Sequence, residues 1–431
     1  MIPINFMFSI NVILLCENLN AEAKLQIISK ITRTFWQNLG YIVFFFYLCM
    51  VKFEKTRLSM KIYNILFAAF LSFSLLPATA QKVTLGSCHT KDGGEYSGEM
   101  QSGKPQGKGK TTWKNGNTYE GEYVKGKRQG YGVYTFFDGE KYEGQWFQDQ
   151  QHGQGTYYFQ NNNKYVGLWF RDFQQGHGVM RYYNGDVYDG EWKQDRRHGQ
   201  GRYTYANGAW YDGEWVDDKK NGKGKFDWGD GSTYEGQWKD DHQQGKGTFR
   251  YANGDVYVGQ FVADLQHGKG IYKFQNGDSY EGDYVKGERT GQGVFRYANG
   301  DRYTGQLEQG AKQGQGLLVW KNGNSYNGEW KQDKPNGRGK LTMKNGDVYE
   351  GQFRDGQIHG EGIARYSDGS KFKGHFRHGK RHGPAIEVDK EGKRFEGSYV
   401  EDRRDGRFVE KDRNGTIVAQ GTYIRGKRQL D

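Results

Sequence analysis

Cysteine, proline and long aliphatic runs are scarce in this sequence of 431 residues, which holds 3 cysteines and 5 prolines. Cys88 is the only cysteine after residue 80, so the main part of the chain can build neither a disulfide framework nor a cysteine-based metal site. A mean hydropathy of −0.96 leaves little material for large aliphatic cores. These shortages exclude a disulfide-rich scaffold and disfavour ordinary globular domains.

Glycine and aromatic residues are abundant instead, with 66 glycines and 16% aromatics. So many aromatic residues argue against disorder, and glycine does not recur at every third position as collagen requires. The formal charge is +11, but residues 1–80 hold 7 of the 62 basic and 3 of the 51 acidic residues, which leaves +7 beyond them. Both signs are interspersed there, so no nucleic-acid patch is predicted, whereas weak attraction to an anionic surface is compatible with this charge.

The N-terminal region contains a secretory signal that begins at an internal methionine. Met60 opens a short basic start, Ile65–Leu76 is apolar, and Ala78-Thr79-Ala80 offers small residues for cleavage. We therefore interpret residues 60–80 as a signal peptide.

The preceding residues 1–59 contain no repeat unit, and we interpret them as a start-site extension. If Met1 is the true start, Ile62–Leu76 serves as an uncleaved membrane anchor with basic residues on its N-terminal side. Both interpretations export the rest of the chain to the periplasm, the cell envelope or the medium.

An aromatic residue followed by glycine two positions later recurs every 23 residues without a slip. A Gly-x-Gly pair and an Asn-Gly or Asp-Gly pair keep the same period, and Asn162 replaces the glycine of the latter pair once. Fourteen units in one register leave no room for an inserted domain. The aromatic positions are Tyr96, Tyr119, Tyr142, Tyr165, Tyr188, Tyr211, Tyr234, Tyr257, Tyr280, Tyr303, Tyr326, Tyr349, Phe372 and Phe395.

These columns predict a β-hairpin in each unit. Asn-Gly and Asp-Gly suit a type I′ turn, whose twist matches that of the flanking strands. On either side, residues alternate between two faces: Tyr119, Gly121 and Tyr123 share one face, and Glu120 and Glu122 share the other. The glycine leaves space for a ring from the adjacent strand to lie over the backbone. A single hairpin is marginal, but stacked units cover each other's edges.

The predicted fold is therefore all-β, an elongated, twisted, single-layer antiparallel β-sheet built of tandem β-hairpins. Two strands per unit, at ~4.8 Å each, advance the sheet by ~10 Å, so the ribbon would span on the order of 130 Å. We assign residues 81–94 to a short linker, residues 95–417 to the ribbon with its last two repeats degenerate, and residues 418–431 to a C-terminal partial repeat or tail.

The combined pattern resembles the MORN (membrane occupation and recognition nexus) repeat over about residues 95–417. It departs from that repeat at the C-terminal end, where Gly383-Pro384-Ala385 and Gly406-Arg407-Phe408 lose the second glycine and Phe372 and Phe395 replace tyrosine. Terminal repeats diverge where one side faces water or a partner, so these units look like a cap or an oligomer contact. The signature residues include Tyr119, Gly121, Tyr142, Gly144, Trp146, Tyr188, Gly190, Trp192, Gly199, Gly201, Tyr234, Gly236, Trp238, Tyr326, Gly328 and Trp330.

The resemblance implies an elongated sheet that serves as a scaffold, spacer or docking strip and often self-associates. Lipid-headgroup binding is claimed for some members of the family. MORN enzymes keep catalysis in a separate domain, and the stretches beside the repeats are too short for one, so we expect no enzymatic activity.

The residues themselves point to no catalytic, cofactor or metal site. Equivalent histidines in neighbouring units would lie ~10 Å apart, too far to share a zinc ion with Zn–N distances of about 2 Å, so we interpret them as polar turn residues. Gly-x-Gly lacks the following helix of a phosphate loop, and carboxylate pairs such as Glu120 and Glu122 recur on a solvent face without a pocket. The histidines that precede Gly-x-Gly or its remnant are His152, His198, His267, His359 and His382.

We therefore predict an exported, non-enzymatic scaffold that mediates protein–protein interaction or self-association at the cell envelope. The alternative is a surface binder of anionic lipid or glycan. The stacked rings are expected mainly to pack on one another, with a groove for a peptide, glycan or lipid as the second interpretation. The basic residues proposed for surface binding lie on the opposite face and are Arg181, Arg250, Lys273, Arg296 and Arg365.

Overall fold

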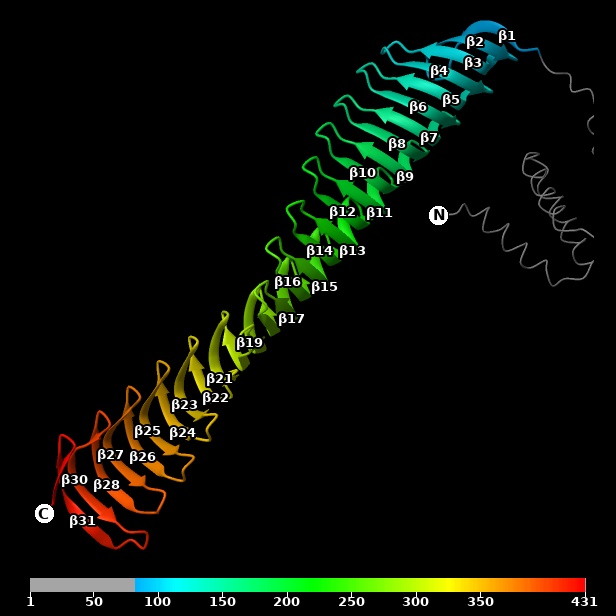
Figure 1. The fold of residues 1–431 in the computed structure, drawn as a ribbon. Coiled ribbons are helices and arrows are strands. Elements are labelled where there is room, and N and C mark those ends of the chain that lie inside the picture. Colours follow the sequence, from blue (N-terminus) through cyan, green and yellow to red (C-terminus); the bar gives the residue numbers. More distant parts are fainter. Residues whose placement is uncertain (1–81, 431) are drawn as a thin grey trace, which may run out of the picture. The chain divides into compact units, whose positions relative to one another are not determined.

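The computed structural model describes residues 82–430, which form one open antiparallel β-sheet of 32 strands (Figure 1). The predictions for residues 1–59 and 60–80 concern the chain outside this described range. Within the range, no helix is long and apolar enough to cross a membrane. The strands are β1 (Thr84–His89), β2 (Glu95–Gln101), β3 (Lys104–Thr112), β4 (Thr118–Val124), β5 (Lys127–Thr135), β6 (Lys141–Phe147), β7 (Gln150–Tyr158), β8 (Lys164–Phe170), β9 (Phe173–Arg181), β10 (Val187–Lys193), β11 (Arg196–Thr204), β12 (Trp210–Val216), β13 (Lys219–Asp227), β14 (Thr233–Lys239), β15 (His242–Arg250), β16 (Val256–Val262), β17 (Leu265–Lys273), β18 (Ser279–Val285), β19 (Glu288–Arg296), β20 (Arg302–Glu308), β21 (Ala311–Val319), β22 (Ser325–Lys331), β23 (Lys334–Thr342), β24 (Val348–Arg354), β25 (Gln357–Arg365), β26 (Lys371–Arg377), β27 (Lys380–Val388), β28 (Arg394–Val400), β29 (Arg403–Arg404), β30 (Gly406–Lys411), β31 (Ile417–Ile424) and β32 (Lys427–Leu430).

The sheet is a continuous meander, because each strand pairs with the strand that follows it in the chain. β10, for example, pairs with β9 on one side and β11 on the other. The one irregularity lies near the C-terminal end, where β28 pairs with both β29 and β30. Figure 1 shows these strands stacked into a twisted ribbon. The predicted single-layer, all-β architecture built of tandem hairpins is confirmed.

The ladder continues at both ends beyond the predicted ribbon. Residues 81–94 are not simply a linker, since β1 pairs with β2 over all six of its residues. At the other end β31 and β32 extend the sheet through the predicted tail. A sheet edge offers backbone donors and acceptors to any extended segment, so these segments can pair without carrying the repeat pattern.

The core is the aromatic face of the ribbon. Tyr188 is 0% exposed, and its ring lies over two glycines: a Cβ atom at Gly201 would be 2.3 Å from the Tyr188 hydroxyl oxygen, and one at Gly190 would be 2.6 Å from it. The hydroxyl donates to the backbone oxygen of Glu191 at 2.9 Å. The predicted space over glycine is confirmed, with one correction: the ring over Gly190 comes from its own strand, because the tyrosine side chain leans along the strand direction.

The Asn-Gly turns are not of the predicted type I′. Between β9 and β10, Gly185 donates its N–H to the oxygen of Tyr182 at 3.0 Å, and only Gly185 has positive φ, at 92°. A type I′ turn needs positive φ at both central residues, whereas a type I turn accepts Asn there and favours Gly after it. Asn184 instead uses its side-chain oxygen to accept the N–H of Asp186 at 3.1 Å. Asn162 takes the glycine position with a φ of 64°, as predicted.

The type I′ turns lie at the opposite edge of the ribbon, where the sequence analysis did not place them. Between β10 and β11, Gln194 and Asp195 have φ values of 49° and 64°. The position that Asp195 occupies holds Asp or Gly in every unit, and both tolerate positive φ. This restriction to Asp or Gly was the feature of the sequence that could have indicated the type I′ turns.

Gly-x-Gly marks a bulge inside a strand rather than a loop. Gly190 faces Gly201 and Trp192 faces Arg197, so three residues of β11 stand opposite the single residue Glu191. Gly199, at the centre of the bulge, has a φ of 64°. Bulges bend the strand that carries them, and their repetition in every unit gives the sheet its curved cross-section (Figure 1).

Candidate interaction surface

The aromatic face forms a groove that crosses the strands. We call it the aromatic groove and define it by the columns of Tyr188, Trp192, Tyr203 and Tyr205. Tyr188 meets Trp192 edge-on at 5.2 Å between ring centroids and meets Trp215 of the next unit at 5.5 Å. Tyr203 and Tyr205 are only partly buried and form the open side of the stack. The predicted packing of rings against one another is therefore confirmed, and it leaves an accessible surface.

A cation from the chain itself lies over these rings in several units. The Cζ atom of Arg197 is 4.5 Å from the ring centroid of Trp215 and 5.2 Å from that of Tyr203. Asp218, in the next type I′ turn, accepts the backbone N–H of Arg197 at 3.0 Å and its Nε–H at 3.1 Å. Ring faces and a carboxylate thus hold the guanidinium together. Equivalent cations over rings are Arg128, Lys220, Arg289, Lys312 and Arg381.

The turn position holds Gly opposite both prolines of the column, and also opposite Gln266, Arg289 and Ile358. Asp195 accepts the N–H of Gln174 at 2.7 Å. Gly126 and Gly356 occupy the same position where the facing residues are Pro105 and Pro335, which have no N–H to donate. A carboxylate at these two turns would therefore have no backbone partner.

The cation column is interrupted at Pro105, Gln243, Gln266, Pro335 and Ile358. It is also interrupted at Gln151 and Gln174, two consecutive units in which the glutamines are only 7% and 5% exposed. A cavity of about 620 Å³ in the aromatic groove is lined here by rings that include Trp169 and by the carboxylates of Asp172 and Asp195. In the described chain each of these two carboxylates accepts one hydrogen bond, a glutamine backbone N–H at 2.7 Å. Burial raises the pKa of Asp195, with the hydrogen bond from Gln174 opposing that rise. The cavity is thus aromatic, acidic and without a cation of its own.

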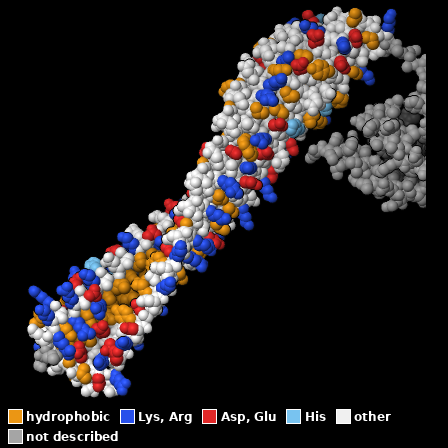
Figure 2. Space-filling view, in the orientation of Figure 1, with side chains coloured by type: hydrophobic (Ala, Val, Ile, Leu, Met, Phe, Trp, Pro, Cys, Tyr) orange, Lys and Arg blue, Asp and Glu red, His pale blue; other side chains and the backbone are white. Residues whose placement is uncertain are grey.

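The five basic residues proposed for surface binding lie on the face opposite the aromatic groove. Each ends a nine-residue strand and is exposed. Arg296 pairs with Glu281 at 3.3 Å and Arg365 pairs with Glu350 at 3.4 Å. Figure 2 shows Lys and Arg interspersed with Asp and Glu along the ribbon. The face is therefore mixed in charge. The others among the five are Arg181, Arg250 and Lys273.

The histidines before Gly-x-Gly stand in strands, one residue before the bulge glycine, and not in turns. His198 belongs to β11, and its Nδ1 atom is 4.0 Å from a carboxylate oxygen of Asp217. In residues 82–430 no cluster of three or more His, Cys, Asp or Glu side chains could hold a metal ion. The prediction that these histidines are turn residues is therefore wrong, because each lies in a strand beside the bulge.

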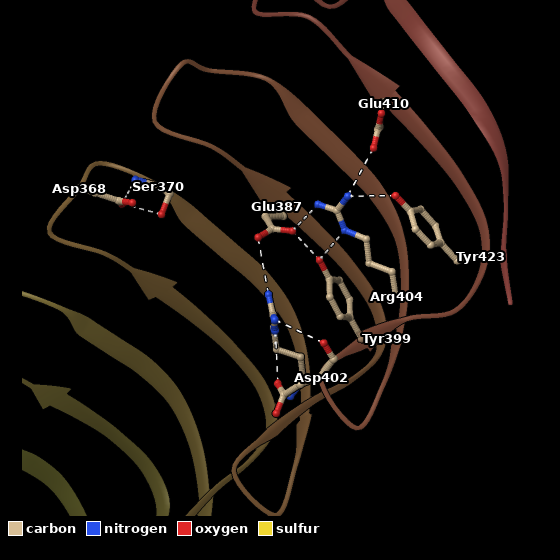
Figure 3. A network of polar contacts seen from close by, with 9 residues as sticks. Asp368, Ser370, Glu387, Tyr399, Asp402, Arg404, Glu410 and Tyr423 are labelled. Carbon is tan, nitrogen blue, oxygen red and sulfur yellow. Dashed lines mark hydrogen bonds and ion pairs between the residues drawn. The ribbon is translucent and has the colours of Figure 1, made fainter. Parts of the chain in front are cut away.

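The degenerate C-terminal units carry a polar network in the aromatic groove (Figure 3). Glu387 stands in the column of Tyr203, and Arg404 donates to it at 2.8 Å while lying 3.8 Å from the ring centroid of Phe395. Burial disfavours ionisation of Glu387, but the hydrogen bonds from Arg404 and Tyr399 outweigh it and lower the pKa of Glu387. In the last units, an ion pair between Glu387 and Arg404 therefore takes the place of stacked rings.

Comparison with known proteins identifies the repeat. The family model described as "MORN repeat" matches thirteen consecutive segments from residue 96 to residue 394; the fourteenth unit, which begins at Phe395, lies beyond them. No curated protein matches the sequence.

Three solved structures are similar to part of this chain. The TCP domain of SAS-4 (dCPAP) from Drosophila melanogaster, in complex with a proline rich motif of Ana2, is 15% identical, with 36% of this chain and 85% of that chain covered and a TM-score of 0.24. A mutant TCP10 domain of Danio rerio CPAP is 10% identical (68% and 99% covered, TM-score 0.12), and streptogramin B lyase is 13% identical (64% and 92% covered, TM-score 0.12). These scores are too low to assign a shared fold.

Proposed function

Since this chain belongs to the MORN repeat family, whose repeats mediate protein interaction or membrane binding, we propose that it is an exported, non-enzymatic scaffold that docks a protein along its aromatic groove. The observation that carries the proposal is the cavity between Gln151 and Gln174, an open aromatic surface with unneutralised carboxylates. Accessible rings bordered by polar and charged groups are typical of protein-binding surfaces.

A membrane-binding role through the opposite face is less well supported. Arg296 and Arg365 are already ion-paired, and acidic side chains are interspersed with the basic ones. Such a face has little net charge with which to attract an anionic lipid surface.

Salt dependence separates these two functions. The mature chain would be immobilised, exposed to envelope proteins from the producing cells, and washed at rising salt; a parallel sample would be sedimented with anionic liposomes. Docking in the groove should persist at 1 M salt, where the Debye length is about 3 Å, because apolar contacts with the rings are not screened by salt. Retention of liposomes but of no protein, lost as salt rises, would contradict the proposal.

Export rests on the sequence of residues 60–80 alone. N-terminal sequencing of the protein recovered from the producing cells tests it. We expect the mature chain to begin at or near Gln81; a chain that begins at Met1 and stays inside the cell would overturn the exported role.

A further inference from the structure

Units of the aromatic groove whose type I′ turn holds Asp are built as receptors for a cation, and several of them contain one supplied by the chain. Arg197 shows the complete arrangement, with its guanidinium against the rings of Trp215 and Tyr203 and its Nε–H on Asp218. Lys220 repeats it with an ammonium group, 5.4 Å from the ring centroid of Trp238 and 3.4 Å from an Asp241 oxygen. The site therefore accepts either kind of basic side chain.

Two adjacent receptors keep a turn carboxylate without a basic partner and lack this internal cation. The other adjacent pair of glutamines differs, because Gln243 faces Asp264, which pairs with His242 at 2.6 Å, and Gln266 faces the glycine turn at Gly287. Gln174 and Gln151 stand one and two repeats before Arg197, in the same column. The receiving groups remain, because Asp195 and Asp172 keep their places in the type I′ turns and in the cavity lining. Within residues 82–430, no Lys or Arg lies over the rings of Trp169 or Trp192. The indole N–H of Trp169, which also lines the cavity, has no hydrogen-bond partner there, whereas that of Trp192 donates to the Gly178 oxygen at 3.0 Å.

We propose that the partner docks at Gln151 and Gln174 by an extended polypeptide segment whose lysine or arginine side chains occupy these two empty receptors. The inference rests on the proposed function and specifies the chemistry of its partner. Neighbouring receptors are one repeat apart, which is about 10 Å for two strands. An extended chain in the polyproline II conformation advances about 3.1 Å per residue with three residues per turn, so side chains three positions apart lie on the same side, about 9 Å apart. The two basic residues should therefore be three positions apart.

The charge of the cavity decides against an anionic lipid as its occupant. Asp172, Asp195 and Asp218 all line it, and the two without a basic partner would repel phosphate. A cation gains from both the ring faces and the carboxylates. A polypeptide also supplies two linked cations, so that binding of the first raises the effective concentration of the second.

The test uses a fluorescent peptide with two lysines three positions apart, separated by Gly and Ser, titrated by anisotropy with the mature chain. The Gln174→Arg variant fills one receptor as Arg197 does and should weaken binding at least 10-fold. Asp195→Asn should weaken it several-fold, whereas Glu191→Gln, on the opposite face of β10, should leave it unchanged. Peptides with leucine for lysine, or with the lysines one or five positions apart, should bind at least 10-fold more weakly.

Equal affinity of the chain and of Gln174→Arg for the peptide would overturn the inference, and so would equal affinity for the lysine and leucine peptides. The second comparison uses only the unaltered chain and does not depend on how a variant folds. If an envelope protein is still retained by the Gln174→Arg variant while the peptide fails to bind, the basic-segment inference fails and the scaffold function stands.

Discussion

The tyrosine ring over paired glycines can be tested by replacing Gly201 with alanine. The new Cβ atom would lie 2.3 Å from the Tyr188 hydroxyl oxygen and 2.6 Å from its Cζ atom. Tyr188 is completely buried, and it cannot retreat without weakening its hydrogen bond to Glu191 and its edge contacts with Trp192 and Trp215.

The cost follows from these contacts. Overpacking of a filled core costs about 1–3 kcal/mol, and loss of a buried hydrogen bond adds about 0.5–1.5 kcal/mol. We therefore expect Gly201→Ala to destabilise the ribbon around β10 and β11 by about 2–4 kcal/mol. The adjacent Gln200 is exposed on the opposite face, and Gln200→Ala should change stability by less than about 0.5 kcal/mol.

The chain itself contains the compensating change. At the equivalent place in the degenerate units, Ala385 replaces the glycine and Phe372, which has no hydroxyl, replaces the tyrosine; both are buried. Tyr188→Phe should therefore relieve part of the clash in Gly201→Ala. The double variant should be about 1–2 kcal/mol more stable than the sum of the two single changes predicts.

Hydrogen exchange of the backbone amides in β10 and β11 is the suitable assay, because an array of repeats need not unfold in one step. It compares the native chain, the two single variants, the double variant and Gln200→Ala. The steric reasoning is refuted if Gly201→Ala loses no more protection than Gln200→Ala, or if Tyr188→Phe adds to the loss instead of reducing it.

Three further predictions concern charge. Burial raises the pKa of both Tyr257 and Tyr280 to about 12. The contribution of these neutral tyrosines to folding stability is complete below the unfolded pKa of about 10 and is lost as pH rises through 12. Circular dichroism should therefore show alkaline unfolding in that window. Burial disfavours ionisation of Asp186, but its hydrogen bonds lower its pKa overall. The stabilisation from its carboxylate is present above about pH 3.9 and is lost as pH falls through the folded pKa. Asp186→Asn should therefore cost about 1 kcal/mol at pH 7 and reduce the dependence of the unfolding free energy on pH below about 3.9, measured by urea denaturation. Gln174→Arg, by adding the missing cation, should raise the thermal midpoint by several degrees, as about 1 kcal/mol from a ring contact and a carboxylate implies; a lower midpoint would contradict the equivalence with Arg197.

The repeat, its period and its single-layer sheet could be predicted from the sequence because they depend on local chemistry. Glycine two positions after tyrosine, and the alternation of Tyr119 with Glu120, fix the buried face of each strand without reference to distant contacts. The same locality explains why Asn162 could replace a turn glycine.

Turn types and the bulge could not be predicted in the same way. Asn184-Gly185 fits either of two turns, and the choice depends on which residues close the hairpin: Tyr182 donates its N–H to the Asp186 oxygen at 2.9 Å, which leaves three residues in the loop instead of two. The empty receptors at Gln151 and Gln174 were missed because glutamine in a repeat column looks neutral until the rings, the turn carboxylates and Arg197 are seen to meet.

The claim that the aromatic groove is the docking face can be measured directly with a photo-reactive amino acid at one of two positions. Phe159 lines the groove, and Val166, on β8, is 43% exposed on the opposite face. In the producing cells, cross-linking from position 159 should yield one discrete adduct that the basic peptide competes away, and position 166 should yield none. An adduct formed only from position 166, or one from position 159 that the peptide leaves unchanged, would contradict the account.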